Sequence, residues 1–89
     1  MYTLENFFEV EVNLLLDGIL NGYDNICKCE RCKSDIQALA LNSLPAKYIV
    51  SEKGEMYTKV LAEIDAQQKI NVITSIIKAI EIVSANPRH

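Results

Sequence analysis

The chain has 89 residues, of which 49% are apolar and 24% are charged, and its formal net charge is −3. This length predicts one domain, residues 1–89, and the apolar content predicts a folded chain with a modest core. The negative charge argues against nucleic acid or an anionic membrane as a partner of the whole surface. No apolar run approaches the roughly 20 residues of a membrane span. The first residues also lack the positive charge of a secretory signal, so we expect a cytoplasmic protein without a membrane partner.

The first predicted element is an amphipathic helix over residues 3–21. One face collects apolar side chains at helical spacing, namely Leu4, Phe8, Val12, Leu15 and Ile19. Thr3 is a suitable N-cap for this helix. We expect Phe7 and Phe8 in the core, and the alternative is an aromatic platform on which a ligand stacks.

A loop over residues 22–30 leads into a Cys-rich knuckle, residues 27–32, which holds every cysteine of the chain. From about Arg31 the sequence turns helical again, with Ile36, Leu39 and Ala40 on one face. Pro45 disfavours helical backbone at the residue before it, so we expect this helix to end near Asn42 or Ser43.

Residues 44–54 are predicted to connect two helices. Within them, Tyr48-Ile49-Val50 favours extended backbone, because aromatic and β-branched side chains suit a strand. The sequence offers no second run of this kind. If the strand pairs at all, we expect its partner to be the same strand in another subunit.

Residues 56–85 contain neither Gly nor Pro and read as helix, either as one rod or with a break near residues 65–68. Val60, Leu61 and Ile64 are expected to face inward. The later part carries two adjacent apolar stripes, the first Ile70, Ile73, Ile77 and Ile80, the second Val72, Ile76, Ala79 and Val83. Together they exceed the stripe that one core needs, so we expect one of them to contact a second subunit. These elements predict an all-α bundle of three to four helices with an irregular middle segment, assembled as a symmetric homodimer.

The knuckle is the strongest chemical signal in the sequence. Zinc prefers thiolate and imidazole ligands at short spacings, and Cys27, Cys29 and Cys32 supply three thiolates within one turn of chain. Neighbouring cations, Lys28, Arg31 and Lys33, are expected to lower the thiol pKa values. We therefore predict a structural zinc site.

Three sulfurs leave one position of a tetrahedral zinc site open. The candidates for the fourth ligand are His89, a carboxylate of Asp24, Glu30 or Asp35, a water molecule, or a group from a partner subunit, and we favour a protein group over water. The alternative uses of the thiols are an iron–sulfur cluster, a redox pair of Cys29 and Cys32, or no ligand at all.

Other chemistry is sparse in this sequence. The single histidine is the last residue, a poor position for a general base, and three glycines form no phosphate loop, so we expect no enzyme. Cations lie beside aromatic residues in one group: Lys47, Tyr48, Tyr57, Lys59 and Arg88. Such residues can hold a phosphate while a ring stacks on a base. The alternative is ordinary solvated surface.

An ensemble of short motifs resembles the ComFB family of late competence proteins. It comprises Cys-x-Cys-x-x-Cys, the following Asp-Ile-x-Ala-Leu-Ala-Leu-Asn-x-Leu-Pro, then Lys47-Tyr48-Ile49-Val50, Gly54, Tyr57-x-Lys59 and Asn86-Pro87-Arg88-His89. The resemblance covers most of the chain from Cys27 onwards. It implies a small, mostly helical, non-enzymatic dimer with zinc on Cys27, Cys29 and Cys32.

The same resemblance also suggests a cellular function. The family takes its name from a competence operon, and its members have been linked to sensing cyclic dinucleotides. We therefore expect a dimeric regulatory module that binds a cyclic dinucleotide and passes this state to a protein partner. The alternative is a structural adaptor that binds a protein partner without a small ligand. A third possibility is a zinc-dependent protein that binds nucleic acid. Its affinity for DNA or RNA should fall steeply as the salt concentration rises.

Overall fold

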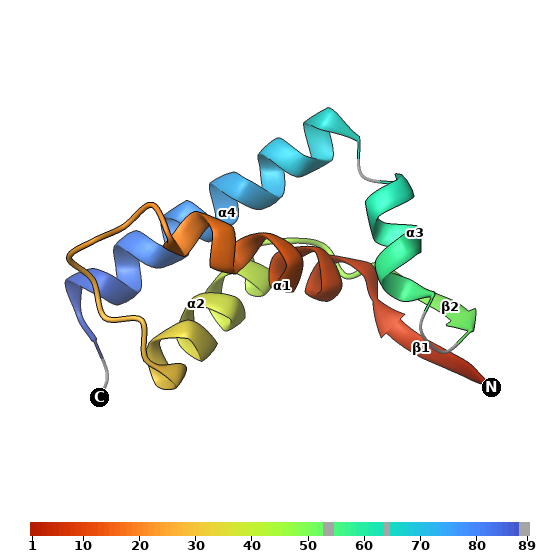
Figure 1. Ribbon diagram of the computed structural model, residues 1–89, viewed down its shortest axis with the longest axis horizontal. Coiled ribbons are helices and arrows are strands. Elements are labelled where there is room, and N and C mark those ends of the chain that lie inside the picture. Colours follow the sequence, from red (N-terminus) through yellow and green to blue (C-terminus); the bar gives the residue numbers. More distant parts are fainter. Residues whose placement is uncertain (53–54, 64, 88–89) are drawn as a thin grey trace.

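A two-stranded antiparallel ribbon lies at one end of a set of four helices in this computed structural model, counted over the residues that it describes, 1–52, 55–63 and 65–87 (Figure 1). The elements in chain order are β1 (Tyr2–Asn6), α1 (Phe7–Leu20), α2 (Glu30–Asn42), β2 (Tyr48–Glu52), α3 (Met56–Glu63) and α4 (Ala66–Ala85). Helices α1, α2 and α4 pack against one another, and α3 packs against α1 beside the ribbon. None of the described helices has the length and apolar character to cross a membrane.

The first segment of the chain corrects the prediction of one helix over residues 3–21. Residues 2–6 form β1, and α1 begins only at Phe7. The cap is Asn6, not Thr3, because the Asn6 side chain accepts a hydrogen bond of 3.2 Å from the Phe8 amide. Leu4 shared the helical spacing of the core residues, yet it lies on the strand with 67% of its surface exposed.

The ribbon also corrects the all-α class and the expected partner of the second strand. β2 pairs with β1 of the same chain, in a register that places Leu4 opposite Val50 and Glu5 opposite Ile49. Just beyond the ladder, the Phe7 amide donates to the Lys47 carbonyl at 2.6 Å. The partner strand was missed because its residues also fit the helical pattern of α1.

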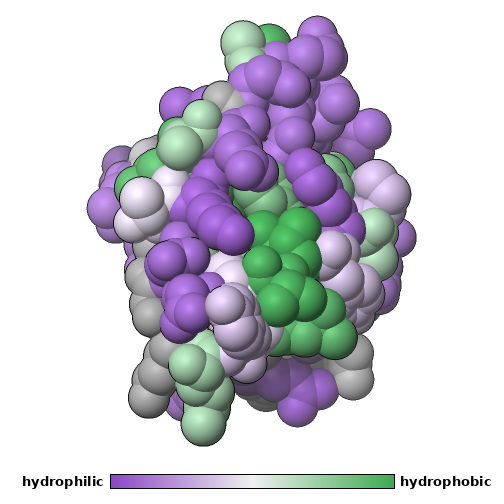
Figure 2. All heavy atoms as spheres, turned by 90° about the vertical axis from the view of Figure 1, so that its right-hand side faces the viewer, coloured by the Kyte–Doolittle hydropathy of each residue, from purple (hydrophilic) through white to green (hydrophobic). Residues whose placement is uncertain are grey.

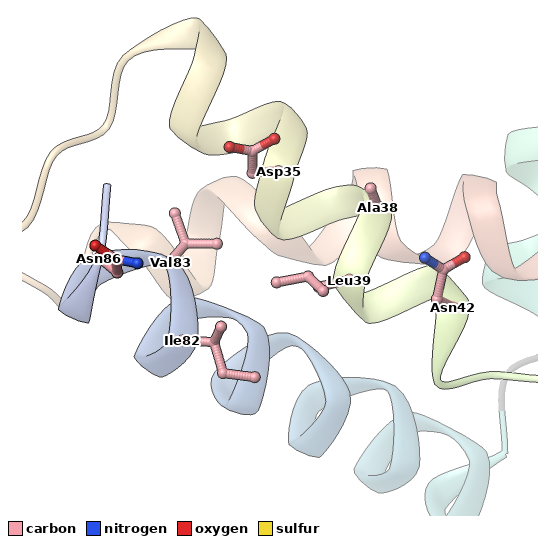
Figure 3. A pocket seen from close by; sticks show the side chains of 7 residues that line it. All are labelled: Asp35, Ala38, Leu39, Asn42, Ile82, Val83 and Asn86. Carbon is pink, nitrogen blue, oxygen red and sulfur yellow. The ribbon is translucent and has the colours of Figure 1, made fainter. Parts of the chain in front are cut away.

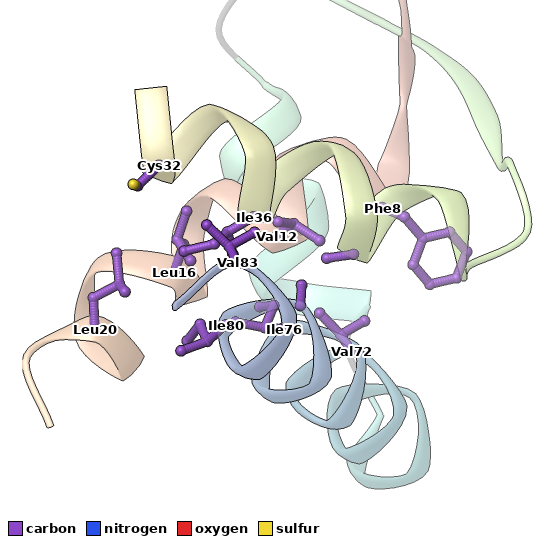
Figure 4. Packing of buried hydrophobic residues seen from close by; sticks show 12 residues of the cluster. Phe8, Val12, Leu16, Leu20, Cys32, Ile36, Val72, Ile76, Ile80 and Val83 are labelled. Carbon is purple, nitrogen blue, oxygen red and sulfur yellow. The ribbon is translucent and has the colours of Figure 1, made fainter. Parts of the chain in front are cut away.

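The main core lies between α1, α2 and α4 (Figure 4). Its largest contributions are Phe8, Val12, Leu16 and Leu20 from α1, Cys32, Ile36 and Ala40 from α2, and Val72, Ile76, Ala79, Ile80 and Val83 from α4. Phe8 is therefore a core residue, and so is Phe7 in the second cluster, in agreement with the first interpretation of this pair. The predicted end of α2 near Asn42 is confirmed.

A second, smaller cluster joins the ribbon end of the molecule to α1. Phe7 and Val10 of α1 pack there against Met56 and Val60 of α3. The expectation that Val60 faces inward is confirmed, whereas Leu61 is 68% exposed and was wrongly assigned to the core. Ile64, the third residue of that prediction, lies outside the described residues.

The long C-terminal segment is two helices and not one rod, and they are separated at Asp65, the first residue of the range given for a break. Asp65 caps α4 by accepting a hydrogen bond of 2.7 Å from the Gln68 amide. Of the two apolar stripes on α4, the second is fully buried, whereas the first is divided between the buried Ile80 and the 56% exposed Ile70. The larger apolar side chains that α4 leaves accessible are the exposed Ile70 and Ile82 and the half-buried Ile73 and Ile77.

Candidate metal centre

The three cysteine sulfurs meet where the 21–29 loop enters α2. Cys29 is the N-cap of this helix, and its Sγ accepts a hydrogen bond of 3.5 Å from the Cys32 amide. Cys32 is one turn into the helix and 1% exposed, within the main core. Cys27 precedes the helix on the loop, and its side chain packs against the same core. The helix start and the core together thus hold the three thiols close to one another.

The geometry of the three sulfurs fits a metal ion. All three Sγ atoms lie within 4.8 Å of one another. Two thiolates on one tetrahedral zinc are about 3.8 Å apart, given a Zn–S distance of about 2.3 Å. Small side-chain rotations therefore suffice to place Cys27, Cys29 and Cys32 around one ion.

The thiols differ in their tendency to ionise. The pKa of Cys29 is lowered mainly because its thiol sulfur accepts a hydrogen bond from the backbone amide of Cys32. A hydrogen bond from the Cys27 thiol is the second cause. Burial, followed by hydrogen bonding with the other two thiols, raises the pKa of Cys32 to about 12. Two of the three cations expected to lower these pKa values are paired with carboxylates, Lys33 with Asp17 at 2.8 Å and Arg31 with Asp35 at 3.4 Å.

A fourth ligand does not appear among the described residues, where the clustered ligand atoms are the three sulfurs alone. Asp35, one of the carboxylate candidates, forms the ion pair with Arg31. His89 lies outside the described residues. The site that this part of the chain supplies is a set of three thiols on a rigid frame.

The predicted basic and aromatic residues are only partly brought together. Tyr48 lies on β2 with 64% of its surface exposed, and the Lys59 ammonium of α3 reaches the Val50 carbonyl of the same strand at 3.5 Å. The ammonium of the adjacent Lys47 sits 4.4 Å from the centre of the Phe7 ring. Tyr57 is in α3, but its side chain, like Arg88, lies outside what the structure describes.

The surroundings of Tyr48 include negative charge. A cavity of about 260 Å³ beside it is also lined by Glu5 and Glu9. Two carboxylates oppose a phosphate group at this position. The positive side chains Lys47 and Lys59 are the local groups that would compensate for them.

A buried carboxyl group in α1 was missed by the sequence reasoning. Glu11 is fully buried, its Oε1 accepts a hydrogen bond of 2.8 Å from the Gln68 side chain, and its Oε2 has no partner among the described residues. Its place between Phe8 and Leu15 on the apolar face of α1 was the available signal. The structure thus adds one buried polar contact between α1 and α4.

The chain matches a known protein family over nearly its whole length. The family model described as late competence development protein ComFB matches residues 5–87. The chain belongs to the ComFB family. It is 31% identical to the competence protein ComFB of Bacillus subtilis (strain 168) over 85 residues, which cover 94% of this chain and 85% of that protein. The resemblance drawn from the motifs is therefore confirmed.

The fold agrees with a solved member of the ComFB family. The structure described as the late competence protein ComFB from Bacillus subtilis superposes with a TM-score of 0.81, at 23% identity. The match covers 97% of this chain and 96% of the other. The ribbon and the four described helices are thus a ComFB fold.

A groove of about 320 Å³ lies between α2 and α4, away from the ribbon (Figure 3). The half-exposed Leu39 and Ile82 and the buried Val83 give it an apolar lining, and Asp35, Asn42 and Asn86 are its polar residues. Its lining contains a carboxylate and no cation. This groove suits an apolar side chain better than a phosphate.

Proposed function

We propose that this member of the ComFB family is a cytoplasmic, non-enzymatic regulatory dimer with a structural zinc ion and a cyclic-dinucleotide site. The observation that carries the zinc assignment is the set of three sulfurs within 4.8 Å of one another. Thiolates at short spacing beside a helix start are typical of structural zinc. One of the ligands, Cys32, is itself a core residue, so the metal would bind the loop to the packed interior.

The proposed zinc ion compensates for a small core. The loop over residues 21–29 joins α1 to α2 without regular structure, and Cys27 and Cys29 lie at its end. Binding a metal at three points removes conformational freedom from this loop. A small chain gains more from such a constraint than a large one does.

A cyclic dinucleotide fits the ribbon end of the molecule. The exposed Tyr48 ring offers a stacking surface for a base, and Lys47 and Lys59 flank β2 with positive charge. The carboxylates of Glu5 and Glu9 weaken phosphate binding to one protomer. A two-fold axis beside this surface would offer two copies of the tyrosine and the lysines to a ligand that is itself two-fold symmetric, together with two copies of the carboxylates.

Calorimetric titration with cyclic di-AMP and cyclic di-GMP tests this proposal on protein whose zinc content has been measured. Tyr48→Ala should weaken binding roughly 5- to 150-fold, the range expected for loss of one stacking ring of about 1–3 kcal/mol. Tyr2→Ala is the matched control, because Tyr2 is exposed to a similar degree as Tyr48, 70% against 64%, and lies on the other strand at the opposite end of the ladder. Absence of binding below roughly 100 μM, about −5.5 kcal/mol, would reject the nucleotide site.

The groove between α2 and α4 favours a second candidate, an adaptor that binds a protein partner. Leu39 and Ile82 present exposed apolar side chains there without a cation to attract a nucleotide. Under this function, Ile82→Lys abolishes binding of a purified partner and leaves the zinc content unchanged. A zinc-loaded dimer that binds neither nucleotide would give this candidate the greater support.

A further inference from the structure

The three thiols of the cluster differ in what can reach them. Cys29 is exposed, Cys27 is half-buried, and Cys32 is 1% exposed inside the main core. A reagent in solution therefore meets the Cys29 sulfur first, whereas Cys32 can react only with a sulfur that is already beside it. An exposed thiol next to a buried one suits a Cys-x-x-Cys redox pair, in which the first thiol attacks and the second closes a disulfide.

The backbone at the start of α2 brings Cys29 and Cys32 within reach of each other. Cys29 is the N-cap, Cys32 is the third helical residue, and the Lys33 amide closes the first turn on the Cys29 carbonyl at 2.9 Å. Residues three apart on a helix have Cα atoms about 5 Å apart, within the range of roughly 4.4–6.8 Å that a disulfide spans. The helical backbone therefore does not have to move for these two sulfurs to bond.

The Cys29 side chain is already turned toward Cys32. Its Sγ accepts a hydrogen bond of 3.5 Å from the Cys32 amide, so it lies back over the first turn of α2. The Sγ atoms of the two residues are within 4.8 Å of each other. A disulfide bond is about 2.05 Å long, so rotation of the exposed Cys29 side chain has to close the remaining distance.

We propose that Cys29 and Cys32 are a reversible dithiol–disulfide pair, which a low-molecular-weight disulfide oxidises at Cys29 and whose oxidation releases the metal from the site. The disulfide step rests on the thiols alone. The release of the metal rests on the zinc site of the proposed function. The cluster then has two states, a reduced one that holds the metal and an oxidised one that does not.

The oxidation consists of two thiol–disulfide exchanges. The Cys29 thiolate attacks one sulfur of the small disulfide, whose S–S bond breaks, and the first small thiolate leaves. The Cys32 sulfur then attacks Cys29 in this mixed disulfide, and the second small thiolate leaves. Each departing thiolate takes up one proton, from Cys29 in the first exchange and from Cys32 in the second. The two protein thiols lose two electrons, and the small disulfide gains them as it becomes two thiols.

The disulfide leaves too few thiolates for a metal ion. The chain has three cysteines, so Cys27 remains as the single thiol once the other two are joined. Zinc in a structural site needs four ligands, and the sulfurs of a disulfide are no longer thiolates. The new bond lies within the first turn of α2, so it does not replace the attachment of the 21–29 loop through Cys27 and the metal.

The thiols and the ribbon lie at opposite ends of the molecule (Figure 1). The ribbon end, which Figure 2 shows face on, has an apolar patch bordered by polar side chains and carries the residues proposed for the nucleotide. Oxidation at the start of α2 therefore changes no group of that surface. A failure of the reduced protein to bind a nucleotide would count against the proposed function and not against the disulfide pair.

Peptide mapping tests the pair on the full metal-free chain treated with oxidised glutathione. Trypsin places the three cysteines on three separate peptides, because it cuts after Lys28, Arg31 and Lys33. With the remaining thiols blocked by iodoacetamide, we expect the Cys29 peptide to be joined to the Cys32 peptide, and a reductant should separate them. A bond from Cys29 to Cys27, or glutathione that stays on Cys29, would overturn the pair.

Substitutions separate the roles of the two sulfurs. Cys32→Ala removes the second sulfur, so glutathione should accumulate on Cys29 at least roughly tenfold above wild type. Cys27→Ser is the matched control, and in metal-free protein it should form the Cys29–Cys32 bond at a rate within about threefold of wild type. Loss of the bond in Cys27→Ser would refute the assignment of Cys32 as its partner. If Cys32→Ala fails to fold, the peptide map of the wild-type chain decides.

Zinc-loaded protein tests the release of the metal. We expect about one zinc ion to leave for each disulfide formed, measured with a chromogenic chelator, and to bind again after reduction. A disulfide that forms while the metal is retained would overturn the release. A chain that binds no zinc in its reduced state would reject the zinc site of the proposed function, while the peptide map would still decide whether the disulfide pair exists.

Discussion

The side-chain amide of Gln68 donates a 2.8 Å hydrogen bond to Glu11, a residue 57 positions earlier in the chain. The contact joins α1 to the first turn of α4, next to the Asp65 cap. Glu11 is fully buried, and its second oxygen has no partner among the described residues. A carboxylate in this position has exchanged water for one neutral donor, which costs stability.

We expect Glu11→Gln to stabilise the protein by about 1–2 kcal/mol at neutral pH. An amide keeps the acceptor for Gln68, and its neutral form costs less to bury than a charge. Urea unfolding followed by circular dichroism measures the change. Glu9→Gln, an exposed position on the same helix, should stay within about 0.5 kcal/mol of wild type. Destabilisation by Glu11→Gln would mean that the carboxylate has a strong ionic partner.

Cys32→Ser is expected to lower zinc content and thermal stability together. The substitution removes one of three ligands and places a hydroxyl in a core position that is 1% exposed. A loss of about 2 kcal/mol corresponds to a fall in Tm of roughly 8–16 °C for a domain of this size. Calorimetry and metal analysis of the same sample provide the two readings.

A chelator provides the control for the metal contribution. Wild-type protein stripped of zinc should match Cys27→Ser in Tm, because Cys27 is half-buried and its loss removes a ligand with little change to the core. Cys32→Ser should melt lower than both. Loss of the metal with an unchanged Tm would show that the site does not stabilise the fold.

Alkylation with iodoacetamide should distinguish the thiols of metal-free protein. Cys29 is exposed and has a lowered pKa, so it forms the reactive thiolate at lower pH than an ordinary cysteine. Cys32 is buried with its pKa raised to about 12, so it should remain a protonated, unreactive thiol through pH 9. Mass spectrometry of peptides follows each site with time.

Zinc should protect the thiols against this reagent. Metal binding occupies the thiolates and removes the nucleophile. Equal alkylation of Cys29 with and without zinc would indicate that this residue is not a ligand. Faster reaction of Cys32 than of Cys29 would contradict the burial of Cys32 in the main core.

Parts of the fold followed directly from local sequence. Pro45 predicted the end of α2, and the helical period of α4 predicted its apolar stripes, although it did not tell which stripe is buried or whether the helix begins anew at Asp65. Each of these features depends on neighbouring residues in one element. The ribbon did not follow, because residues 2–6 fit a helical pattern as well as a strand and the choice depends on β2, more than forty positions away.

The candidate sites divide in the same way. The thiol cluster and the family could be read from local sequence, because the three cysteines are confined to six positions and the motifs lie at fixed spacings. The burial of Cys32 and the exposure of Cys29 could not be read in this way, since that difference comes from the packing of α2 on α1 and α4. The tertiary structure also brought Lys59 to β2 and Gln68 to Glu11. Contacts between distant elements depend on how whole faces pack, and no local pattern encodes them.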